Sequence, residues 1–237
     1  MPTSGAPRRE ERNQLLLALP RADYELLRPD LRDISLPHGE VLFEPQQRIT
    51  HVYFPQHCVV SLLTPIAGES SVEVAIVGNE GMVGVGIFLG TGTSSMRAVS
   101  QVPDDARRLT VAAFRRALAR GPALRRIMLR YTDTVVSQIS QCAACNQRHC
   151  VEQRCARWFL MAHDRVGADQ FALTQEFLGQ MLDVQRPTVS TAAHRLQAMG
   201  AIRYRRGHVT VTDRSRLERA SCVCYRAMVD DYARAFA

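Results

Sequence analysis

A run of polar side chains between residues 185 and 195 has the chemistry needed to recognise a nucleic acid. Its members carry hydrogen-bond donors or acceptors, and they are Gln185, Arg186, Thr188, Ser190, Thr191, His194 and Arg195. Guanidinium, amide, hydroxyl and imidazole groups match phosphates and the base edges of a major groove. A solvated polar face on an ordinary helical hairpin is the plainer alternative, so the elements that position these residues decide the interpretation.

The segment around this run predicts two short helices joined by a tight turn. Thr174 is a typical N-cap for a first helix that ends near Leu182, and Asp183 begins the turn. Pro187 suits the start of a second helix, because its missing N–H is not needed there, and Gly200 suits the end. The apolar residues of the second helix recur at steps of three and four, and they are Val189, Ala192, Ala193, Leu196 and Met199. The segment therefore predicts a helix-turn-helix whose polar face stays free.

A second basic feature follows directly along the chain. Two short alternating runs flank an Arg-Gly-His turn at residues 206–208, which predicts a small hairpin, or wing. Arg203, Arg205, Arg206 and His208 would place cations beside a duplex backbone, where contacts fix the register rather than read the sequence. The predicted set of DNA-contacting residues also includes Thr174, Gln175 and Pro187.

The charge of the chain is consistent with a polyanionic partner. The 237 residues carry a formal net charge of +7, and residues 148–237 hold 14 arginines against 9 acidic residues. A basic domain attracts polyanions in general, so charge alone does not separate DNA from RNA or from an anionic membrane. Because no apolar stretch is long enough to span a bilayer and no signal peptide is evident, we expect a cytoplasmic protein without a membrane partner.

No catalytic constellation is evident in the sequence. The chain contains no lysine for a phosphate-binding loop and no Gly-x-Ser-x-Gly elbow. Cys142 and His149 are residue types that can act as a nucleophile and its general base, but nothing supplies a third group to orient the histidine. We therefore expect that the protein is not an enzyme.

The N-terminal half has the pattern of a β-rich domain. Helix is expected from Gln14 to Leu27 with a break at Pro20, followed by short strands between glycine and proline turns. The strand candidates span residues 34–36, 41–44, 51–54, 59–64, 72–77, 82–88, 97–102 and 108–111. Eight short strands at this spacing favour a sandwich or barrel, and helix returns at residues 111–120.

A long helix is then expected from Ala123 to about Arg148. At 1.5 Å per residue it would span about 39 Å, more than a small domain needs. A seam at alternating steps of three and four runs along it, formed by Met128, Tyr131, Val135, Gln138, Cys142 and Cys145. We predict that this seam is a homodimer interface; the alternative is that it packs on the strands of its own chain.

The order of these parts, a β-roll, a long helix and a winged helix-turn-helix, resembles the bacterial Crp/Fnr transcription regulators. The most specific stretch is residues 173–212, in which Gln-Arg-Pro-Thr-Val-Ser at 185–190 opens the second helix. The resemblance implies an α+β fold with an antiparallel, jelly-roll-like β-roll. It also implies a homodimer that places two recognition helices about 34 Å apart on a pseudo-palindromic operator, with RNA polymerase as a further partner.

The resemblance also assigns roles and domain boundaries. Arg186 matches the family's guanine-reading arginine, whereas Pro187 and Thr191 depart from the glutamate and the arginine of other members, which leaves the operator sequence open. The implied domains are a signal-sensing roll at 14–120, a dimerisation helix at 121–148, a winged helix-turn-helix at 149–220 and a C-terminal tail at 221–237.

The signal sensed by the roll is a separate question. Cyclic-nucleotide-binding members hold the ribose with a glutamate and the phosphate with an arginine, and the counterparts here fall on Gly84, Val85, Arg97 and Ala98. Val85 cannot accept a hydrogen bond from a ribose hydroxyl, and losing such a buried partner costs about 1–3 kcal/mol. We therefore do not expect cyclic AMP as the effector, and no cofactor is assigned.

Seven cysteines allow three interpretations. The chain has a dense group at Cys142, Cys145, Cys150 and Cys155 and a pair at Cys222 and Cys224. Packing as small apolar residues is favoured, with thiol redox sensing and metal binding as alternatives. Residues 142, 145 and 149 share one helix face while 150 and 155 point elsewhere, so no metal site is predicted. The alternative function is a thiol redox-switch protein that signals through protein partners rather than DNA.

Overall fold

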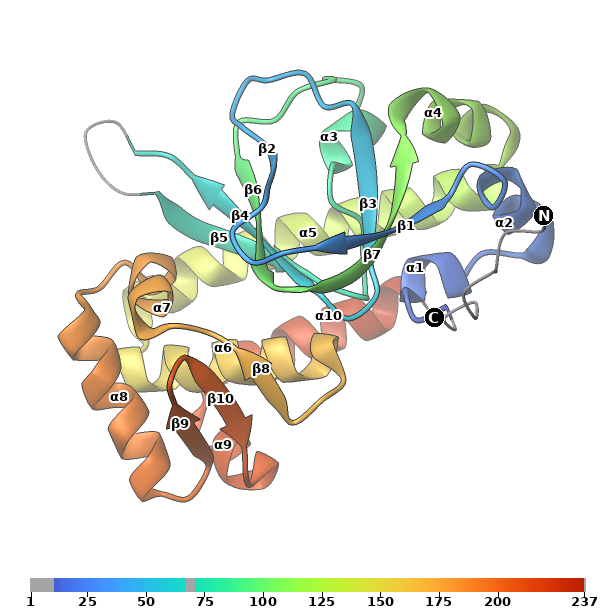
Figure 1. Cartoon of the computed structure of the whole chain (residues 1–237). Helices are drawn as coiled ribbons and strands as arrows, with labels where there is room; N and C mark the ends of the chain where they lie inside the picture. The colour runs from blue at the N-terminus through green and yellow to red at the C-terminus, as the bar shows by residue number, and fades with distance from the viewer. Residues whose placement is uncertain (1–10, 67–70, 237) are drawn as a thin grey trace, which may run out of the picture.

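The computed structural model describes residues 11–66 and 71–236. It has an N-terminal β-roll, a long helix that runs behind the roll in this view, and a C-terminal domain below them (Figure 1). The predicted α+β fold is confirmed. Among the described residues, no helix combines the length and the apolar character needed to cross a bilayer.

The roll begins with the two predicted helices, α1 (Gln14–Leu17) and α2 (Arg21–Leu27), which are separated at Pro20. Its strands form two antiparallel sheets. One has the order β1 (Arg32–Leu36), β7 (Asp104–Thr110), β3 (His51–Pro55). The other has the order β2 (Val41–Phe43), β6 (Arg97–Val102), β4 (Val59–Thr64), β5 (Val72–Val77). Seven of the eight predicted strand segments are therefore strands.

The eighth prediction, a strand over residues 82–88, is wrong. Val83 makes a single bridge to Tyr53, and the chain then turns into the short helix α3 (Val85–Phe88). Gly84 makes the turn with φ +103°, a conformation open to glycine and costly for other residues. The alternation of small and apolar residues here therefore reflects a turn and a helical turn rather than a strand.

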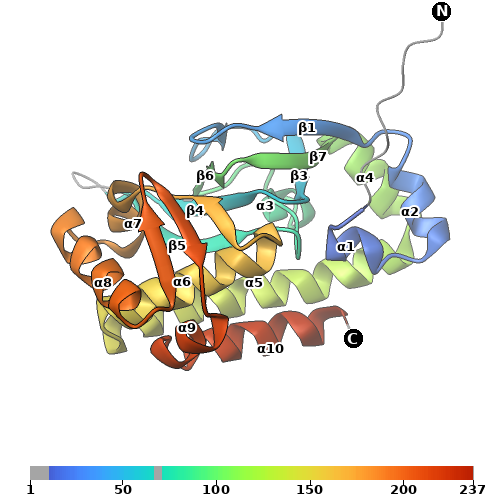
Figure 2. The ribbon, with the colours of Figure 1, turned by 60° about the horizontal axis from the view of Figure 1, so that its bottom comes forward.

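Two helices follow the roll. Helix α4 (Val111–Arg120) and helix α5 (Pro122–Arg148) are joined at Gly121, close to the predicted boundaries. A further helix, α10 (Cys224–Phe236), replaces the predicted C-terminal tail. It runs along α5, so that α5 lies between the roll and α10 (Figure 2). Buried Tyr232 of α10 donates a hydrogen bond to Gln138 of α5 at 2.8 Å, which shows that this segment belongs to the core.

The C-terminal domain is built on α6 (Val151–Val166), which follows α5 after a short break. Its other elements are β8 (Gln170–Ala172), α7 (Gln175–Leu182), α8 (Arg186–Ala198), β9 (Ile202–Arg205), β10 (His208–Val211) and α9 (Arg214–Ala220). The predicted hairpin is β9–β10, and β8 adds a third strand that sequence patterning missed. The helix pair and its wing therefore form one packed unit on α6.

The roll and the C-terminal domain are joined by buried polar contacts. Trp158 of α6 donates a hydrogen bond to Glu73 of β5 at 2.9 Å. Arg165, also on α6, forms an ion pair with Glu80 of the roll at 3.0 Å, and both side chains are buried. A buried pair of this kind is costly to break, because it would leave one charge uncompensated.

Candidate nucleic-acid interface

The polar run predicted from the sequence forms one exposed face of α8. Every predicted residue between 185 and 195 is exposed, namely Gln185, Arg186, Pro187, Thr188, Ser190, Thr191, His194 and Arg195. The opposite face is buried through Val189, Ala192, Ala193 and Leu196. Met199, predicted to belong to the apolar face, is 40% exposed because it caps the helix end. Helix α8 lies at the outer edge of the domain, away from the roll (Figure 1).

Local backbone features set the angle between α7 and α8. Thr174 caps α7 by accepting a hydrogen bond from the backbone N–H of Phe177. Asp183 adopts a left-handed conformation with φ +51° at the turn, which aspartate tolerates better than most residues. At Gly179 an added Cβ would lie 2.9 Å from the carbonyl oxygen of Val184, so only glycine lets the turn approach this closely. The turn therefore fixes which face of α8 remains free.

The wing lies beside the start of α8. A groove between them is lined by Thr174, Gln175, Glu176, Arg186, Tyr204, Arg206 and Gly207. Tyr204 closes the groove by donating a hydrogen bond to the carbonyl oxygen of Leu173 at 2.7 Å. A second hollow on the wing is lined by Gln170, Arg203, Arg205, Arg206, His208 and Thr210. The structure therefore brings the predicted residues of α7, α8 and the wing to adjoining hollows.

The cations of this surface are available to a ligand. Among the described residues, no ion pair joins Arg186, Arg203, Arg205 or Arg206 to a carboxylate. Arg195 differs, because its guanidinium lies 3.4 Å from Glu152. Unpaired arginines that share one face create a positive potential that attracts polyanions. Thr191 uses its hydroxyl hydrogen for the carbonyl of Pro187, so it retains only acceptor capacity.

The roll contains a cavity of about 320 Å³ between its strands and α5. Of the four residues predicted for an effector pocket, Gly84 and Val85 line this cavity. The other two predicted residues do not: Arg97 forms an ion pair with Glu44 at 3.1 Å, and Ala98 is buried within β6. None of the described residues that line the cavity is charged; they are Phe43, Ile49, Leu62, Val77, Met82, Gly84, Val85, Gly86, Leu89, Thr91, Thr93, Ser94, Ser95, Met96, Tyr131 and Val135.

The predicted dimer seam of α5 is wrong, because its residues are buried within the single chain. The exposed fraction is below 10% for each of Met128, Tyr131, Val135, Gln138, Cys142 and Cys145. Tyr131 donates a hydrogen bond to the carbonyl oxygen of Met82 at 3.0 Å, and Arg157 of α6 contacts Cys142. The seam therefore packs on the roll, α6 and α10, which is the alternative left open by the sequence. The face of α5 that is exposed carries Leu129 and Val136, which are 58% and 57% exposed.

Glu73, at the junction of the two domains, has a strongly shifted pKa. Burial raises the pKa of Glu73 to about 7, against opposing effects of its hydrogen bonds from Ser61 and Trp158 and of Arg157 and Arg165. A carboxylic acid with a pKa near 7 is partly protonated at neutral pH, and its protonated form can donate as well as accept a hydrogen bond. The junction between β5 and α6 therefore contains a group that changes its charge near neutral pH.

One cluster of potential metal ligands was not predicted from the sequence. Cys145 and His149, near the end of α5, meet Cys222 and Cys224 from the connection between α9 and α10. The spacing Cys-x-x-x-His on a helix and the Cys-x-Cys pair are both visible in the sequence, but nothing local indicates that they meet. The expectation that a regular helix cannot gather four ligands holds only for ligands from that helix alone.

Comparison with known proteins agrees with this description. Residues 153–220 match the family model of the Crp-like helix-turn-helix domain, whereas no curated protein sequence matches the chain. A putative transcriptional regulator of the Crp/Fnr family from Eubacterium rectale superposes with a TM-score of 0.65 at 14% identity, covering 89% of this chain and 99% of that one. FixK2 from Bradyrhizobium japonicum gives a TM-score of 0.65 at 16% identity, covering 81% of this chain and 98% of the other.

A third structure, a CRP-family transcriptional regulator from Thermus thermophilus, gives a TM-score of 0.63 at 16% identity and covers 80% of this chain and 96% of its own. Residues 153–220 are therefore similar to the Crp-like helix-turn-helix domain, and the chain as a whole shares its fold with these solved structures. The resemblance predicted from the sequence is confirmed.

Proposed function

We propose that this protein is a homodimeric, sequence-specific DNA-binding transcription regulator that acts in the cytoplasm under control of a signal received by the roll. The observation that carries the proposal is the exposed polar face of α8 beside the unpaired arginines of the wing. A match of this domain to the Crp-like helix-turn-helix family supports it, and disfavours a redox switch that acts only through protein partners.

The roles proposed for the residues of this surface follow from their positions on α7, α8 and the wing. Arg186 lies in the first turn of α8, where a recognition helix enters the major groove, and its guanidinium fits the two acceptors of a guanine. Arg203, Arg205 and Arg206 lie on the wing and reach the phosphate backbone instead. Thr174 and Gln175 at the start of α7 adjoin the same groove and would fix the register of the domain on the duplex.

The homodimer would use the exposed face of α5 rather than the predicted seam. Leu129, Val136 and Ala143 follow one another at intervals of seven residues and are exposed, with half-buried Ile139 between the last two. A repeat of seven is the signature of two helices that pack side by side. A second copy of the chain suits this face, because two 27-residue helices related by a two-fold axis would bury both stripes at once.

The cavity of the roll suits a small, uncharged and largely apolar ligand. A cyclic phosphate would find no counter-charge among the described lining residues, which argues against a cyclic nucleotide bound there. Tyr131 and Val135 of α5 line the cavity, so a ligand would contact the same helix that carries the proposed dimer face. Such a ligand shifts the regulator between two states only by its differential affinity for them.

Selection of DNA from a random pool tests this function. Full-length protein would be incubated with random-sequence duplexes, and the retained duplexes would be sequenced after several rounds. We expect enrichment of an inverted repeat whose half-sites are centred about one helical turn, roughly 34 Å, apart. Recovery of unenriched sequence, with binding that depends only on salt, would contradict sequence-specific recognition.

A further inference from the structure

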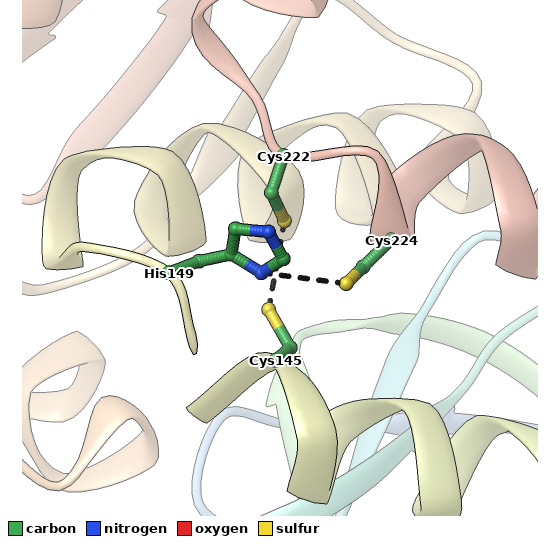
Figure 3. A group of neighbouring side chains, drawn as sticks. All are labelled: Cys145, His149, Cys222 and Cys224. Carbon is green, nitrogen blue, oxygen red and sulfur yellow. Dashed lines mark hydrogen bonds between the residues drawn. The ribbon is translucent and has the colours of Figure 1, made fainter. Parts of the chain in front are cut away.

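Four potential metal ligands from two distant parts of the chain converge where α5 ends. Cys145 lies in the last turn of α5 and His149 caps the helix, so the two are one helical turn apart. Cys222 precedes α10 and Cys224 is its first residue. Figure 3 shows the four side chains turned toward one another, with Cys145 on α5 and with Cys222 and Cys224 on the segment that leads into α10.

The distances suit a single tetrahedral ion. The sulfur atoms of Cys145 and Cys222 are 3.5 Å apart, and the sulfur of Cys224 lies 3.5 Å from Nδ1 of His149. All four ligand atoms lie within 4.8 Å of one another. Zn–S bonds of about 2.3 Å and Zn–N bonds of about 2.0–2.1 Å at tetrahedral angles place sulfurs about 3.8 Å apart and sulfur about 3.5 Å from nitrogen. The cluster is therefore already close to the edge lengths that zinc requires.

The surroundings are those of an enclosed structural site. Cys145, Cys222 and Cys224 are each at most 3% exposed and form an apolar cluster of their own. None of the three is in a disulfide. Gln141 donates a hydrogen bond to the sulfur of Cys224 at 2.9 Å, an outer contact of the kind that orients thiolate ligands.

A buried cation beside the cluster points to negative charge there. Arg157 of α6 is 4% exposed, its Nε has no hydrogen-bond partner among the described residues, and its side-chain hydrogen bonds go only to sulfur atoms. It is close enough to Cys142, Cys145 and Cys222, and to Glu73 of the roll, for Coulombic attraction. Three thiolates and one Zn²⁺ carry a net charge of −1, which would compensate this guanidinium. Glu73 compensates the same guanidinium only in part, because burial raises the pKa of that carboxyl to about 7.

We propose that Cys145, His149, Cys222 and Cys224 form a structural Zn²⁺ site. Three cysteines and one histidine are a recurrent tetrahedral ligand set for this ion, and the closed set leaves no open position for catalysis. The four donor atoms enclose space for one ion rather than for a multi-atom cluster. On binding, Zn²⁺ displaces the three thiol protons to solvent.

The site would link the C-terminal helix to the joint between the two domains. His149 lies in the short break between α5 and α6, and Cys224 begins α10. Metal binding would therefore fix the end of α5, the start of the DNA-binding domain and α10 relative to one another. The metal would hold the domain in place without contributing to what α8 reads.

Metal analysis of the full-length protein tests the site. Protein purified in reducing buffer without added metal is expected to contain one Zn²⁺ per chain by mass spectrometry of the elements. After metal removal, Co²⁺ should bind at one equivalent and give the thiolate charge-transfer absorption and the strong visible bands of tetrahedral cobalt. Cys142→Ala, a change at another buried α5 cysteine, is the matched control and should keep both properties.

Variants that lack one of the proposed metal ligands provide the second part of the test. Cys222→Ser and Cys224→Ser should weaken Co²⁺ binding by more than the roughly 10–100-fold seen for loss of an outer-shell partner. His149→Gln changes a half-buried residue at a helix end, so it should fold and still alter the cobalt spectrum. Wild-type protein that binds neither Zn²⁺ nor Co²⁺ would overturn the proposal. So would unchanged stoichiometry in the serine variants, or a Cys145–Cys222 disulfide in place of bound metal.

Discussion

At the scale of single residues, the functional surface depends on side chains that the fold leaves unpaired. Arg186 is exposed in the first turn of α8, and no ion pair holds it among the described residues. Arg205 is also exposed but lies on the wing strand β9. Because the two arginines share charge and exposure and differ in position, they separate base reading from backbone contact.

Substitution of Arg186 and Arg205 by alanine should therefore have different consequences. Arg186→Ala is expected to relax discrimination at one base position by about 1–3 kcal/mol, since it removes a bidentate contact to a base. Arg205→Ala should weaken all sequences alike and reduce the salt dependence by about one unit of slope. Binding titrations against the selected duplex and its single-base variants measure both effects. Equal losses from both variants on every sequence would refute the assignment of Arg186.

Glu73 predicts a pH dependence of stability. Its pKa is raised to about 7 in the folded protein, against an ordinary value of 4.5, chiefly because of burial. The folded state therefore holds more protons than the unfolded state between about pH 4.5 and 7, so the free energy of unfolding should fall as pH rises through this window.

Glu73→Gln isolates that contribution, because glutamine keeps an acceptor for Trp158 and does not titrate. Melting temperatures of the wild type and the variant would be measured from pH 4.5 to 7.5 at constant ionic strength, and the wild-type value should fall relative to that of the variant as the pH rises. Parallel curves for the two proteins would show that Glu73 does not titrate in this range.

At the scale of elements, the close turn between α7 and α8 leaves no room for a side chain at Gly179. Gly179→Ala would place a methyl group 2.9 Å from the carbonyl oxygen of Val184, and a backbone atom cannot yield cheaply. We expect a loss of about 1–3 kcal/mol of stability from this overpacking and weaker binding to every duplex. Denaturant unfolding and DNA titration measure the two effects. Gly90→Ala is a less crowded comparison, because an added Cβ there meets nothing within 4 Å, although its φ of +88° carries its own strain.

Helix α5 offers a matched pair of neighbours for testing the dimer. Val136 is 57% exposed, whereas the adjacent Val135 is 4% exposed and lines the roll cavity. Val136→Glu should produce a folded monomer, because it puts a charge into the proposed interface, and Val135→Glu should destabilise the chain itself. Sedimentation analysis and circular dichroism distinguish these outcomes. A wild-type protein that is already monomeric would contradict the proposed interface.

The elements differ in how far the sequence predicts them. The helix-turn-helix is signalled locally, by a cap at Thr174, a proline in the first turn of α8 and Gly200 after it, so its boundaries are predictable. Helix α5 has apolar residues on two faces, and periodicity cannot say which face meets the same chain. The spacing of its residues and the length of the helix predict that the inner face forms the dimer, whereas α10, which covers part of this face, is not predicted as a helix.

At the scale of the whole molecule, the roll and the DNA-binding domain are joined through buried polar contacts and through α5. Arg165 pairs with Glu80 of the roll and stacks over the ring of Tyr232 at 5.3 Å, so three segments meet at one side chain. Tyr131 of α5 lines the roll cavity, and α5 leads directly into α6. These long-range contacts, like the Cys–His cluster, have no local sequence signal, because each depends on segments that are far apart in the chain.

The central claim is that α8 reads a DNA sequence. Its most direct test is the affinity of the full-length protein for the selected duplex against a scrambled duplex of the same composition, measured by fluorescence anisotropy between about 50 and 200 mM salt. We expect a preference of at least about 10³-fold for the selected duplex, which persists as salt weakens both complexes. Equal affinity for the two duplexes at every salt concentration would contradict it.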